Sequence, residues 1–413
     1  MKNASAETAA QIRKTLWVIS ELYYPEETST GYYLTKIAEG LADDFNVKAL
    51  CGQPNYSGRG TRSPKRERHN GVEIFRAWGT RLDKNVIPFR LLNMLSLGFS
   101  IFVKALFNFK KGEKILVVTT PPVLPFITAL ACFLKGAEYV LLIHDNYPEI
   151  LVAVGKTSED SAFVKTLDFF NRTLYKHAAK IIVVGRDMRE LLERKTEGLD
   201  VPIDYIPNWA ELEQVSPAAR NDNALLDELG LSEKFVFLYA GNMGHPNDLQ
   251  SIVECAAQLR EDASIHFIFL GAGVKRSWLE REVQARNLSN VTILEPRPRR
   301  EQNVFLNACD VAVVSLIGKM KGVSMPSRTY NILAVGKPIL ALTEQNSEVA
   351  RVVEEEAVGW TVQPNQPSEL LQKIREIERQ REQLSMLGQN ARAAALEKYS
   401  LKTAVESYRK SLT

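Results

Sequence analysis

The chain has 413 residues, of which 52 are basic, 49 are acidic and 45% are hydrophobic. This length predicts two or three domains with substantial cores. The nearly balanced charge, without a long block of one sign, argues against nucleic acid as a partner. The densest basic stretch, RGTRSPKRER at 59–68, is short, and we expect it to be a solvent-exposed loop.

The cysteines predict neither a zinc site nor a disulfide framework, because they are isolated from one another and from histidine. They are Cys51, Cys132, Cys255 and Cys309. The sequence MKNASAETAAQIRK at 1–14 lacks the apolar core of a signal peptide and is expected to be a frayed lead-in. Both features favour a cytoplasmic location.

In the first half of the chain, short apolar runs alternate with amphipathic stretches, a pattern typical of a parallel α/β sheet. Strands are expected at 16–20, 47–51, 72–77, 114–119, 139–143, 181–184 and 203–206. Helices are expected at 31–43, 90–109, 122–134, 160–178 and 186–195.

The segment RLLNMLSLGFSIFVKALFNF at 90–109 has an unusually wide apolar face. Its polar residues form one stripe, about a third of the helix circumference wide: Arg90, Asn93, Ser96, Ser100, Lys104, Asn108 and Lys111. The charge of Lys104 in mid-segment argues against a membrane span. Two compatible alternatives stay open: a helix buried against the sheet, and a helix lying on a membrane surface.

The second half repeats the alternation. Strands are expected at 235–240, 265–270, 291–295, 311–315, 338–342 and 359–362. Helices are expected at 247–260, 274–287, 300–308, 326–335, 347–355 and 367–380, with a last helix at 401–412. The polar stretch 207–223 is typical of an interdomain linker. We therefore predict one Rossmann-like domain at 1–207, a second Rossmann-like domain at 208–399, and a helix at 400–413 that packs back on the first domain.

Two such domains facing across a cleft would place the carboxyl ends of both sheets at that cleft, where α/β proteins bind ligands. The loops that follow strands are 23–31, 119–122, 144–149, 241–247, 271–276, 295–299 and 316–326. The last of these, KGVSMPSR at 321–328, combines glycine, proline and cations before a predicted short helix. This composition suits an anionic ligand, although an ordinary connection with solvated lysines is the alternative.

Several chemistries are not supported by the motifs. FIFLGAGVKR at 267–276 has Arg276 where a dinucleotide fingerprint needs its third glycine. No pair of aspartates follows a strand to hold a metal ion, and no nucleophile–base motif is present. The remaining pattern is a set of glycine-containing loops with the cations Lys275, Arg297 and Arg328, which suits stabilisation of a leaving diphosphate without a metal.

The chain resembles GT-B fold glycosyltransferases of family 4, in the bacterial branch that assembles colanic acid and O-antigen type polysaccharides. The resemblance covers nearly the whole chain. It rests on ELYYPEETSTGYYLTKIAEGLA at 21–42, TTPP at 119–122, HDNYPEILVAVGK at 144–156, IPNWAE at 206–211, YAGNMG at 239–244 and MPSRTYNILAVGKP at 325–338.

The resemblance implies that the domain at 1–207 binds the acceptor and that the domain at 208–399 binds the nucleotide sugar, with some departures in the donor site. The two family glutamates correspond to Val323 and Asn331, and the diphosphate-binding Arg and Lys correspond to positions near Asn242 and Asp248. Arg328 is therefore expected to bind the diphosphate, supported by Lys275, Lys319 or Lys321. The complete donor set that we predict is Gly31, Asn242, Lys275, Arg297, Gly322, Ser324, Ser327, Arg328, Tyr330, Asn331 and Glu348. His144 and Asp145 occupy the place where the family contacts the donor sugar and the acceptor hydroxyl; a helix cap is the alternative for Asp145.

These observations predict a retaining glycosyltransferase that needs no metal and no cofactor. Retention is implied by the resemblance alone. The donor would be a UDP-, GDP- or dTDP-linked sugar, and the acceptor a lipid-linked saccharide reached by peripheral contact of 90–111 with the cytoplasmic face of the inner membrane. Alternatives are a sugar-nucleotide 2-epimerase of the same fold and a non-catalytic nucleotide-sugar-binding homologue.

Overall fold

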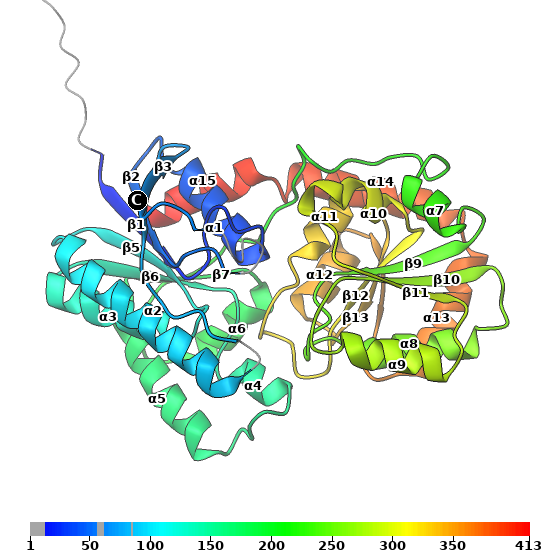
Figure 1. Cartoon of the computed structure of the whole chain (residues 1–413), viewed down its shortest axis with the longest axis horizontal. Coiled ribbons are helices and arrows are strands. Elements are labelled where there is room, and N and C mark those ends of the chain that lie inside the picture. Colours follow the sequence, from blue (N-terminus) through cyan, green and yellow to red (C-terminus); the bar gives the residue numbers. More distant parts are fainter. Residues whose placement is uncertain (1–12, 56–61, 84–85) are drawn as a thin grey trace, which may run out of the picture. The chain divides into compact units, whose positions relative to one another are not determined.

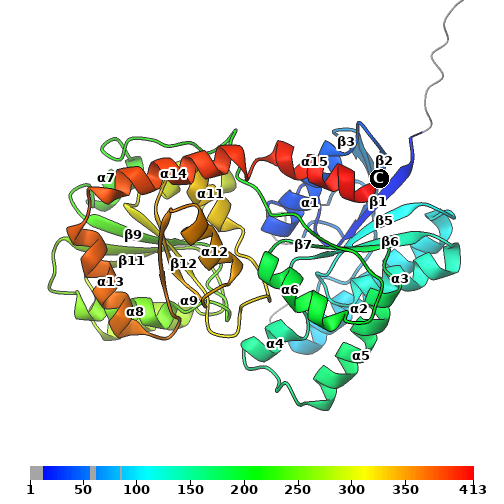
Figure 2. The same ribbon diagram turned by 180° about the vertical axis from the view of Figure 1, so that it is seen from behind.

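The computed structural model describes residues 13–55, 62–83 and 86–413 (Figures 1 and 2). The expected lead-in at 1–14 lies almost wholly outside the described residues, as does the start of the basic stretch 59–68. The chain divides into two compact units, residues 1–141 with 408–413, and residues 142–407. The domain boundaries expected from the sequence stay a prediction.

Elements of the first part of the chain follow the predicted order closely. The strands are β1 (Thr15–Ser20), β2 (Asn46–Cys51), β3 (Arg66–His69), β4 (Val72–Arg76), β5 (Lys114–Val118), β6 (Glu138–Ile143), β7 (Lys180–Val183) and β8 (Ile203–Tyr205). The helices are α1 (Ser29–Gly40), α2 (Ile87–Asn108), α3 (Leu124–Lys135), α4 (Glu149–Ala153), α5 (Ala162–Lys176) and α6 (Arg186–Lys195). The strand order in this sheet is β3-β4-β2-β1-β5-β6-β7-β8.

The edge strand β3 corrects one expectation. The stretch 59–68 is expected from the sequence to be a solvent-exposed loop, but residues 66–69 pair antiparallel with β4, with Arg66 opposite Phe75 and His69 opposite Val72. Charged side chains are common on edge strands, where they discourage pairing with another chain. The pairings of β1 with β2, of β1 with β5 and of β2 with β4 are parallel, as predicted.

The later part of the chain forms a six-stranded sheet in the order β11-β10-β9-β12-β13-β14, in which each pair of neighbouring strands is parallel. The strands are β9 (Phe235–Ala240), β10 (Ile265–Leu270), β11 (Val291–Leu294), β12 (Val311–Ser315), β13 (Ile339–Leu342) and β14 (Gly359–Val362). The helical elements are α7 (Ala224–Leu229), α8 (Leu249–Gln258), α9 (Arg276–Ala285), η1 (Arg299–Glu301), α10 (Gln302–Asn307), α11 (Arg328–Ala334), α12 (Glu348–Glu355), α13 (Pro367–Arg379), α14 (Gln383–Glu397) and α15 (Leu401–Leu412).

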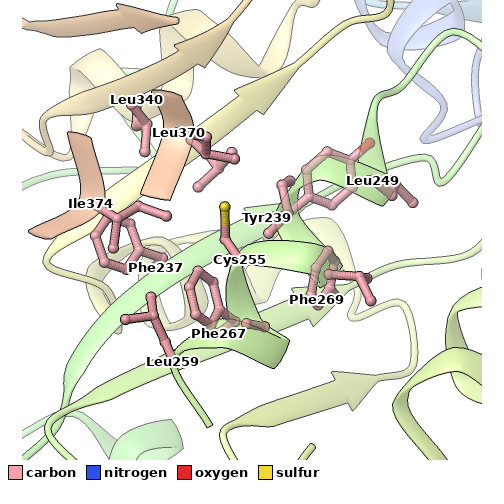
Figure 3. Packing of buried hydrophobic residues seen from close by; sticks show 14 of the residues in the cluster. Phe237, Tyr239, Leu249, Cys255, Leu259, Phe267, Phe269, Leu340, Leu370 and Ile374 are labelled. Carbon is pink, nitrogen blue, oxygen red and sulfur yellow. The ribbon is translucent and has the colours of Figure 1, made fainter. Parts of the chain in front are cut away.

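The core of this sheet lies between its strands and helices α8, α9 and α13 (Figure 3). Alternate residues of β9 and β10 point into it, so that the rings of Phe237 and Phe267 stack with centroids 5.5 Å apart. Cys255 lies in the middle of this cluster and is a free thiol. Burial raises the pKa of Cys255 to about 12, so it serves as a packing residue.

The last turn of α15 belongs to the first unit. There Arg409 forms an ion pair with Asp44 at 2.7 Å, and Lys114 Nζ donates to the carbonyl of Leu412 at 2.7 Å. Tyr408 and Leu412 are buried beside these contacts. The end of the chain is thereby fixed to residues of the first unit.

Candidate active site

Two segments predicted separately to form the site lie against each other within the second unit. Asn146 donates its backbone N–H to the carbonyl of Val323 at 2.8 Å and its side-chain Nδ2 to the carbonyl of Gly322 at 2.7 Å. Asp145 and Ser324 form an isolated antiparallel β-bridge. The end of β6 and the loop before α11 are therefore joined by backbone and side-chain hydrogen bonds.

A buried carboxylate holds the same loop from another side. Asp187, which is 4% exposed, accepts hydrogen bonds through Oδ2 from the backbone N–H of Gly322 at 2.9 Å and of Glu348 at 3.0 Å. Burial raises the pKa of Asp187, and these hydrogen bonds act in the opposite direction. One carboxylate thus fixes the loop after β12 and the first turn of α12.

The backbone of Gly322 is expected to tolerate no side chain. Its φ is +75°, and an added Cβ would lie 2.9 Å from the carbonyl oxygen of Asp187. We predict that Gly322→Ala lowers the free energy of unfolding by about 2 kcal/mol, because the left-handed conformation and the close approach both disfavour it. Urea unfolding measures this, with Gly318→Ala as the matched control since nothing lies within 4 Å of a Cβ there. Equal effects of the two substitutions would contradict the prediction.

Burial shifts the proton affinities of the two predicted catalytic residues in opposite directions. The pKa of His144 is lowered to about 4 and that of Asp145 is raised to about 6, both by desolvation. Each side chain retains partial contact with solvent, which moderates the shifts. Near pH 7 the imidazole is neutral and the carboxyl group is mostly ionised, a combination that lets Asp145 accept a proton.

Arg328, the first residue of α11, carries a hydrogen-bond donor that the described residues leave unused. Its guanidinium lies over the ring of Tyr239, with Cζ 4.7 Å from the ring centroid. Its Nη1 is buried without a hydrogen-bond partner among the described residues. A Cβ on Gly241 would come within 2.4 Å of Cζ, so glycine at that position makes room for the guanidinium. A cation with an unused, buried N–H is suited to bind an anion.

The loops after β9 and β10 pack backbone to backbone beside Gly241. Met243 N–H donates to the carbonyl of Ala272 at 2.7 Å, and a Cβ on Gly273 would lie 2.4 Å from the carbonyl oxygen of Met243. Lys275 follows this pairing, and its Nζ donates to the carbonyl of Asn247 at 2.6 Å. Burial lowers the pKa of Lys275. A second cation is therefore held by these glycine-containing loops.

Comparison with known proteins connects these features to a family. Residues 223–394 match the model "Glycosyl transferases group 1", and residues 29–209 match "Glycosyl transferase 4-like domain". A curated protein of Pseudomonas aeruginosa, "Probable glycosyltransferase WbjE", is 30% identical over 95% of this chain and 96% of its own. This chain belongs to the family 4 glycosyltransferases. The resemblance inferred from the motifs is confirmed, and the protein is an enzyme.

Further relatives agree with this assignment. "Putative colanic acid biosynthesis glycosyl transferase WcaI" of Escherichia coli K12 is 26% identical over 86% of this chain and 89% of its own. Among solved structures, sucrose-phosphate synthase of Thermosynechococcus elongatus has a TM-score of 0.76 at 16% identity, covering 96% of this chain and 98% of that one. Anabaena HepE in complex with UDP-glucose has a TM-score of 0.69 at 15% identity, covering 96% and 99%. The two-domain α/β fold of the GT-B type is thereby confirmed.

Three of the predicted donor residues of this glycosyltransferase are engaged elsewhere. Asn331 accepts from Glu211 N–H at 2.9 Å, and its Nδ2 donates to the carboxylate of Glu211 and to Gln302. A ribose diol would have to displace one of these bonds. Arg297 pairs with Glu228 at 3.1 Å, and Tyr330 is 0% exposed. No observation tests their roles, which stay predictions.

Glu348 is likewise occupied. Its carboxylate accepts from Arg186 Nε at 3.0 Å and from Tyr205 O–H at 2.8 Å, and its side chain is 1% exposed. Glu348 therefore has the contacts of a residue that links α6 to α12.

Asn242, in contrast, has an exposed side chain, and its backbone carbonyl accepts from Tyr239 O–H at 2.6 Å. Ser324 and Ser327, which shortly precede Arg328 in the sequence, are half-buried.

Gly31 belongs to the first unit, in the first turn of α1. Its N–H donates to Thr28 Oγ1 at 3.3 Å, which caps the helix. An added Cβ would lie 2.8 Å from the carbonyl oxygen of Glu26, so the glycine allows the preceding loop to pack closely on the helix. The role of Gly31 in binding the donor stays a prediction.

Sequence reasoning missed three residues of the site. Asn146 lies inside the HDNYPE motif but was not assigned a role. Asp187 follows a strand and a glycine, a position that is usually a simple helix start. Tyr239 is part of a buried strand and looked like a core residue. The available signal for each was its position at the end of a strand or within a few residues after it, where ligands of α/β sheets gather.

Helix α2 of this glycosyltransferase exposes the apolar face that its pattern indicated. Phe99 and Phe107 are 69% and 86% exposed. Part of the polar stripe points inward, since Ser100 accepts from Trp78 N–H and Asn93 from Leu82 N–H. Among the described residues, Pro88–Asn108 is the one helix whose length and mean hydropathy of 1.5 would suffice to cross a membrane.

Helix α3 adds a second exposed apolar surface that the sequence analysis did not identify. Leu130, Phe133 and Leu134 are 51%, 82% and 55% exposed. The two helices pack closely, because a Cβ on Gly98 would lie 2.5 Å from Ile127 Cδ1. Neither helix contains an acidic residue. We call the exposed side chains of α2 and α3 the α2–α3 surface.

Proposed function

We propose that this glycosyltransferase moves a sugar from a nucleotide-diphosphate donor to a lipid-linked saccharide during surface polysaccharide synthesis. The observation that carries the proposal is Arg328, whose buried Nη1 has no partner among the described residues and whose guanidinium lies against Gly241. A diphosphate would supply the missing acceptors. Charge-assisted hydrogen bonds of this kind are about twice as strong as neutral ones.

The proposed donor and pathway draw support from the relatives. HepE is a structural neighbour that was solved with UDP-glucose, and WcaI is described as an enzyme of colanic acid biosynthesis. A UDP-, GDP- or dTDP-linked sugar at Arg328 is consistent with these descriptions. The sugar and its nucleotide are to be found by experiment.

Each group near the donor loop is given a proposed role. Arg328, with Lys275 in support, stabilises the negative charge that develops on the leaving diphosphate. Asp145, ionised near neutral pH, accepts the proton of the attacking hydroxyl. His144 is neutral and acts as a hydrogen-bonding group. Asn146 holds the loop at Gly322 beside these residues. Retention of the anomeric configuration follows from the family resemblance.

Binding of the donor is tested by a thermal-shift screen with UDP, GDP and dTDP sugars. Ligand that binds only the folded state raises the melting temperature in proportion to the logarithm of its concentration over Kd. We expect one nucleotide to stabilise the wild-type protein and to stabilise Arg328→Ala much less. An equal shift for both proteins would assign the nucleotide to another site.

The reaction is expected to continue without a metal ion. Among the described residues, no group of three or more His, Cys, Asp or Glu side chains is placed to hold one. We predict that EDTA leaves the transfer rate within about twofold, because the fixed cations balance the diphosphate charge. The rate is measured before and after chelation and after addition of Mg²⁺. A rate that collapses with EDTA and returns only with Mg²⁺ would contradict the prediction.

We further propose that the enzyme works at the cytoplasmic face of the inner membrane as a peripheral protein. The α2–α3 surface offers exposed apolar side chains, exposed Lys110 and Lys111 follow the end of α2, and half-buried Lys135 ends α3. Basic residues near an anionic bilayer contribute about 1 kcal/mol each. A lipid-linked acceptor would be presented at such a surface.

Replacing Phe99 and Phe107 together by serine is expected to lower binding to anionic vesicles by about tenfold or more, since apolar burial drives interfacial attachment. Both side chains are largely exposed, so the fold should persist. The wide apolar pattern also indicated Phe102 as outward. Its side chain is half-buried, however, so Phe102 is a poorer choice than the two exposed phenylalanines. Flotation at low and high salt measures binding. Undiminished flotation of the double variant would exclude the α2–α3 surface as the contact.

A further inference from the structure

Helix α5 exposes three aromatic rings to solvent although it lies in the second unit, apart in sequence from α2 and α3. Phe163, Phe169 and Phe170 are 55%, 69% and 52% exposed. A soluble protein seldom leaves several large apolar side chains together on one surface unless that surface binds something. No part of the proposed transfer reaction uses these residues.

The orientation of α5 is fixed by its inner face. Val164, Leu174 and Tyr175 are buried, and Asn171 donates from Nδ2 to the carbonyl of Tyr147 at 2.7 Å. Ser161 caps the first turn by accepting from Val164 N–H at 3.2 Å. The helix cannot rotate the phenylalanines inward without breaking these contacts. Their exposure is therefore a property of the folded protein.

The exposed residues of α5 have a distinct charge pattern. They are Ala162, Phe163, Lys165, Thr166, Phe169, Phe170, Arg172, Thr173 and Lys176, and none of them is acidic. The helix has one acidic residue, Asp168, which is half-buried and paired with Lys195 at 2.8 Å. At 100° per residue Phe163 and Phe170 lie on the same side, whereas Lys165 and Lys176 lie about 120–160° further round the helix, next to Phe169.

We propose that this α5 surface, formed by its three exposed phenylalanines and three exposed basic residues, binds an anionic phospholipid bilayer. Aromatic side chains enter the boundary between headgroups and acyl chains, while adjacent lysines and arginines attract the anionic headgroups. The charge pattern decides between occupants: the helix has three exposed cations and one acid, Asp168, which is 42% exposed in its side chain but paired with Lys195. Such a net positive helix is complementary to anionic lipid and repels a second copy of itself. The inference shares the membrane location with the proposed function but does not rest on glycosyl transfer.

The test compares flotation of full-length variants with vesicles of phosphatidylglycerol and phosphatidylcholine, and with phosphatidylcholine alone. Phe163→Ser with Phe170→Ser should reduce binding to the anionic vesicles about fivefold or more, since apolar burial is lost. Thr166→Ser with Thr173→Ser is the matched control on the same exposed face and should bind as the wild type does. Lys165→Glu with Lys176→Glu should weaken binding most at low salt.

A second measurement does not depend on losing a phenylalanine. The four native cysteines are buried, so a dye can be placed selectively on Thr166→Cys, between the rings, or on the exposed position Gln372→Cys of α13. Anionic vesicles should shift the emission of the dye on α5 to shorter wavelength and leave the dye on α13 unchanged.

The outcomes separate this inference from the proposed function. If the α2–α3 variant loses flotation while the α5 variant floats normally and its dye does not respond, the α5 surface is not a bilayer contact and the inference is overturned. If neither surface matters, both membrane proposals fail. If the phenylalanine variant instead converts a wild-type dimer into a monomer with unchanged flotation, the surface binds a second copy and the inference is likewise wrong.

Discussion

Replacing Arg328 by alanine is expected to weaken binding of the nucleotide-sugar donor by about 10- to 100-fold, as for loss of a charge-assisted hydrogen bond. The guanidinium is stacked on Tyr239 and its Nη1 is buried without a protein acceptor among the described residues. A diphosphate oxygen at this N–H would satisfy it. Calorimetry with the nucleotide identified by the thermal-shift screen measures the loss.

Two further variants sharpen the result. Arg328→Lys keeps the charge but removes the planar set of donors, so its affinity should fall between those of the wild type and the alanine variant. Arg300→Ala removes an exposed arginine from the same half of the chain and should leave affinity unchanged. If both alanine variants bind the nucleotide as tightly as the wild type does, while melting temperatures are equal, Arg328 does not contact the diphosphate.

Asp145→Asn is expected to lower kcat by about 100-fold or more while the KM for the donor changes little, because a general base acts mainly on the chemical step. Asparagine keeps the size of the side chain but cannot accept a proton at neutral pH. If kcat persists and only the melting temperature falls, Asp145 is a helix cap rather than a base.

The raised pKa of Asp145 gives this prediction a pH dependence. Activity of the wild type should rise with pH through a midpoint of about 6, where the carboxyl group ionises. The same shift affects stability in a defined direction. Between the ordinary value of 3.8 and about 6 the folded state binds more protons than the unfolded state, so stability falls as pH rises through that window. Asp145→Asn lacks this loss and should gain stability relative to the wild type over the same window.

Most of the fold was predictable because the spacing of apolar residues in the sequence matches the pattern of buried residues in the structure. The strands 235–240, 265–270 and 311–315 have the predicted limits, since each is almost entirely apolar. Helix α14 was not predicted. It packs through small residues, and a Cβ on Gly388 would lie 2.3 Å from the carbonyl oxygen of Gly336. A helix whose buried face consists mostly of glycine and alanine, with Leu387 as its one large residue, has only a weak form of the apolar stripe on which such predictions depend.

The site was predictable at the level of loops and less so at the level of side chains. The positions of Asp145 and Ser324 after their strands placed both at a sheet edge, and the structure joins them. The partners of Asn331 could not be foreseen, because they come from Glu211, 120 residues away in sequence. Contacts between distant segments are set by tertiary packing, which local patterns do not contain.

The central claim is best tested by supplying purified enzyme with the donor it binds and with a lipid extract from polysaccharide-producing bacterial membranes. Free nucleoside diphosphate and sugar-labelled lipid are measured together, for the wild type and for Arg328→Ala. We expect the wild type to release diphosphate in step with labelling of the lipid, and the variant to do both far more slowly. Donor that is bound without release, or that returns epimerised at C2 with no diphosphate formed, would contradict glycosyl transfer at this site.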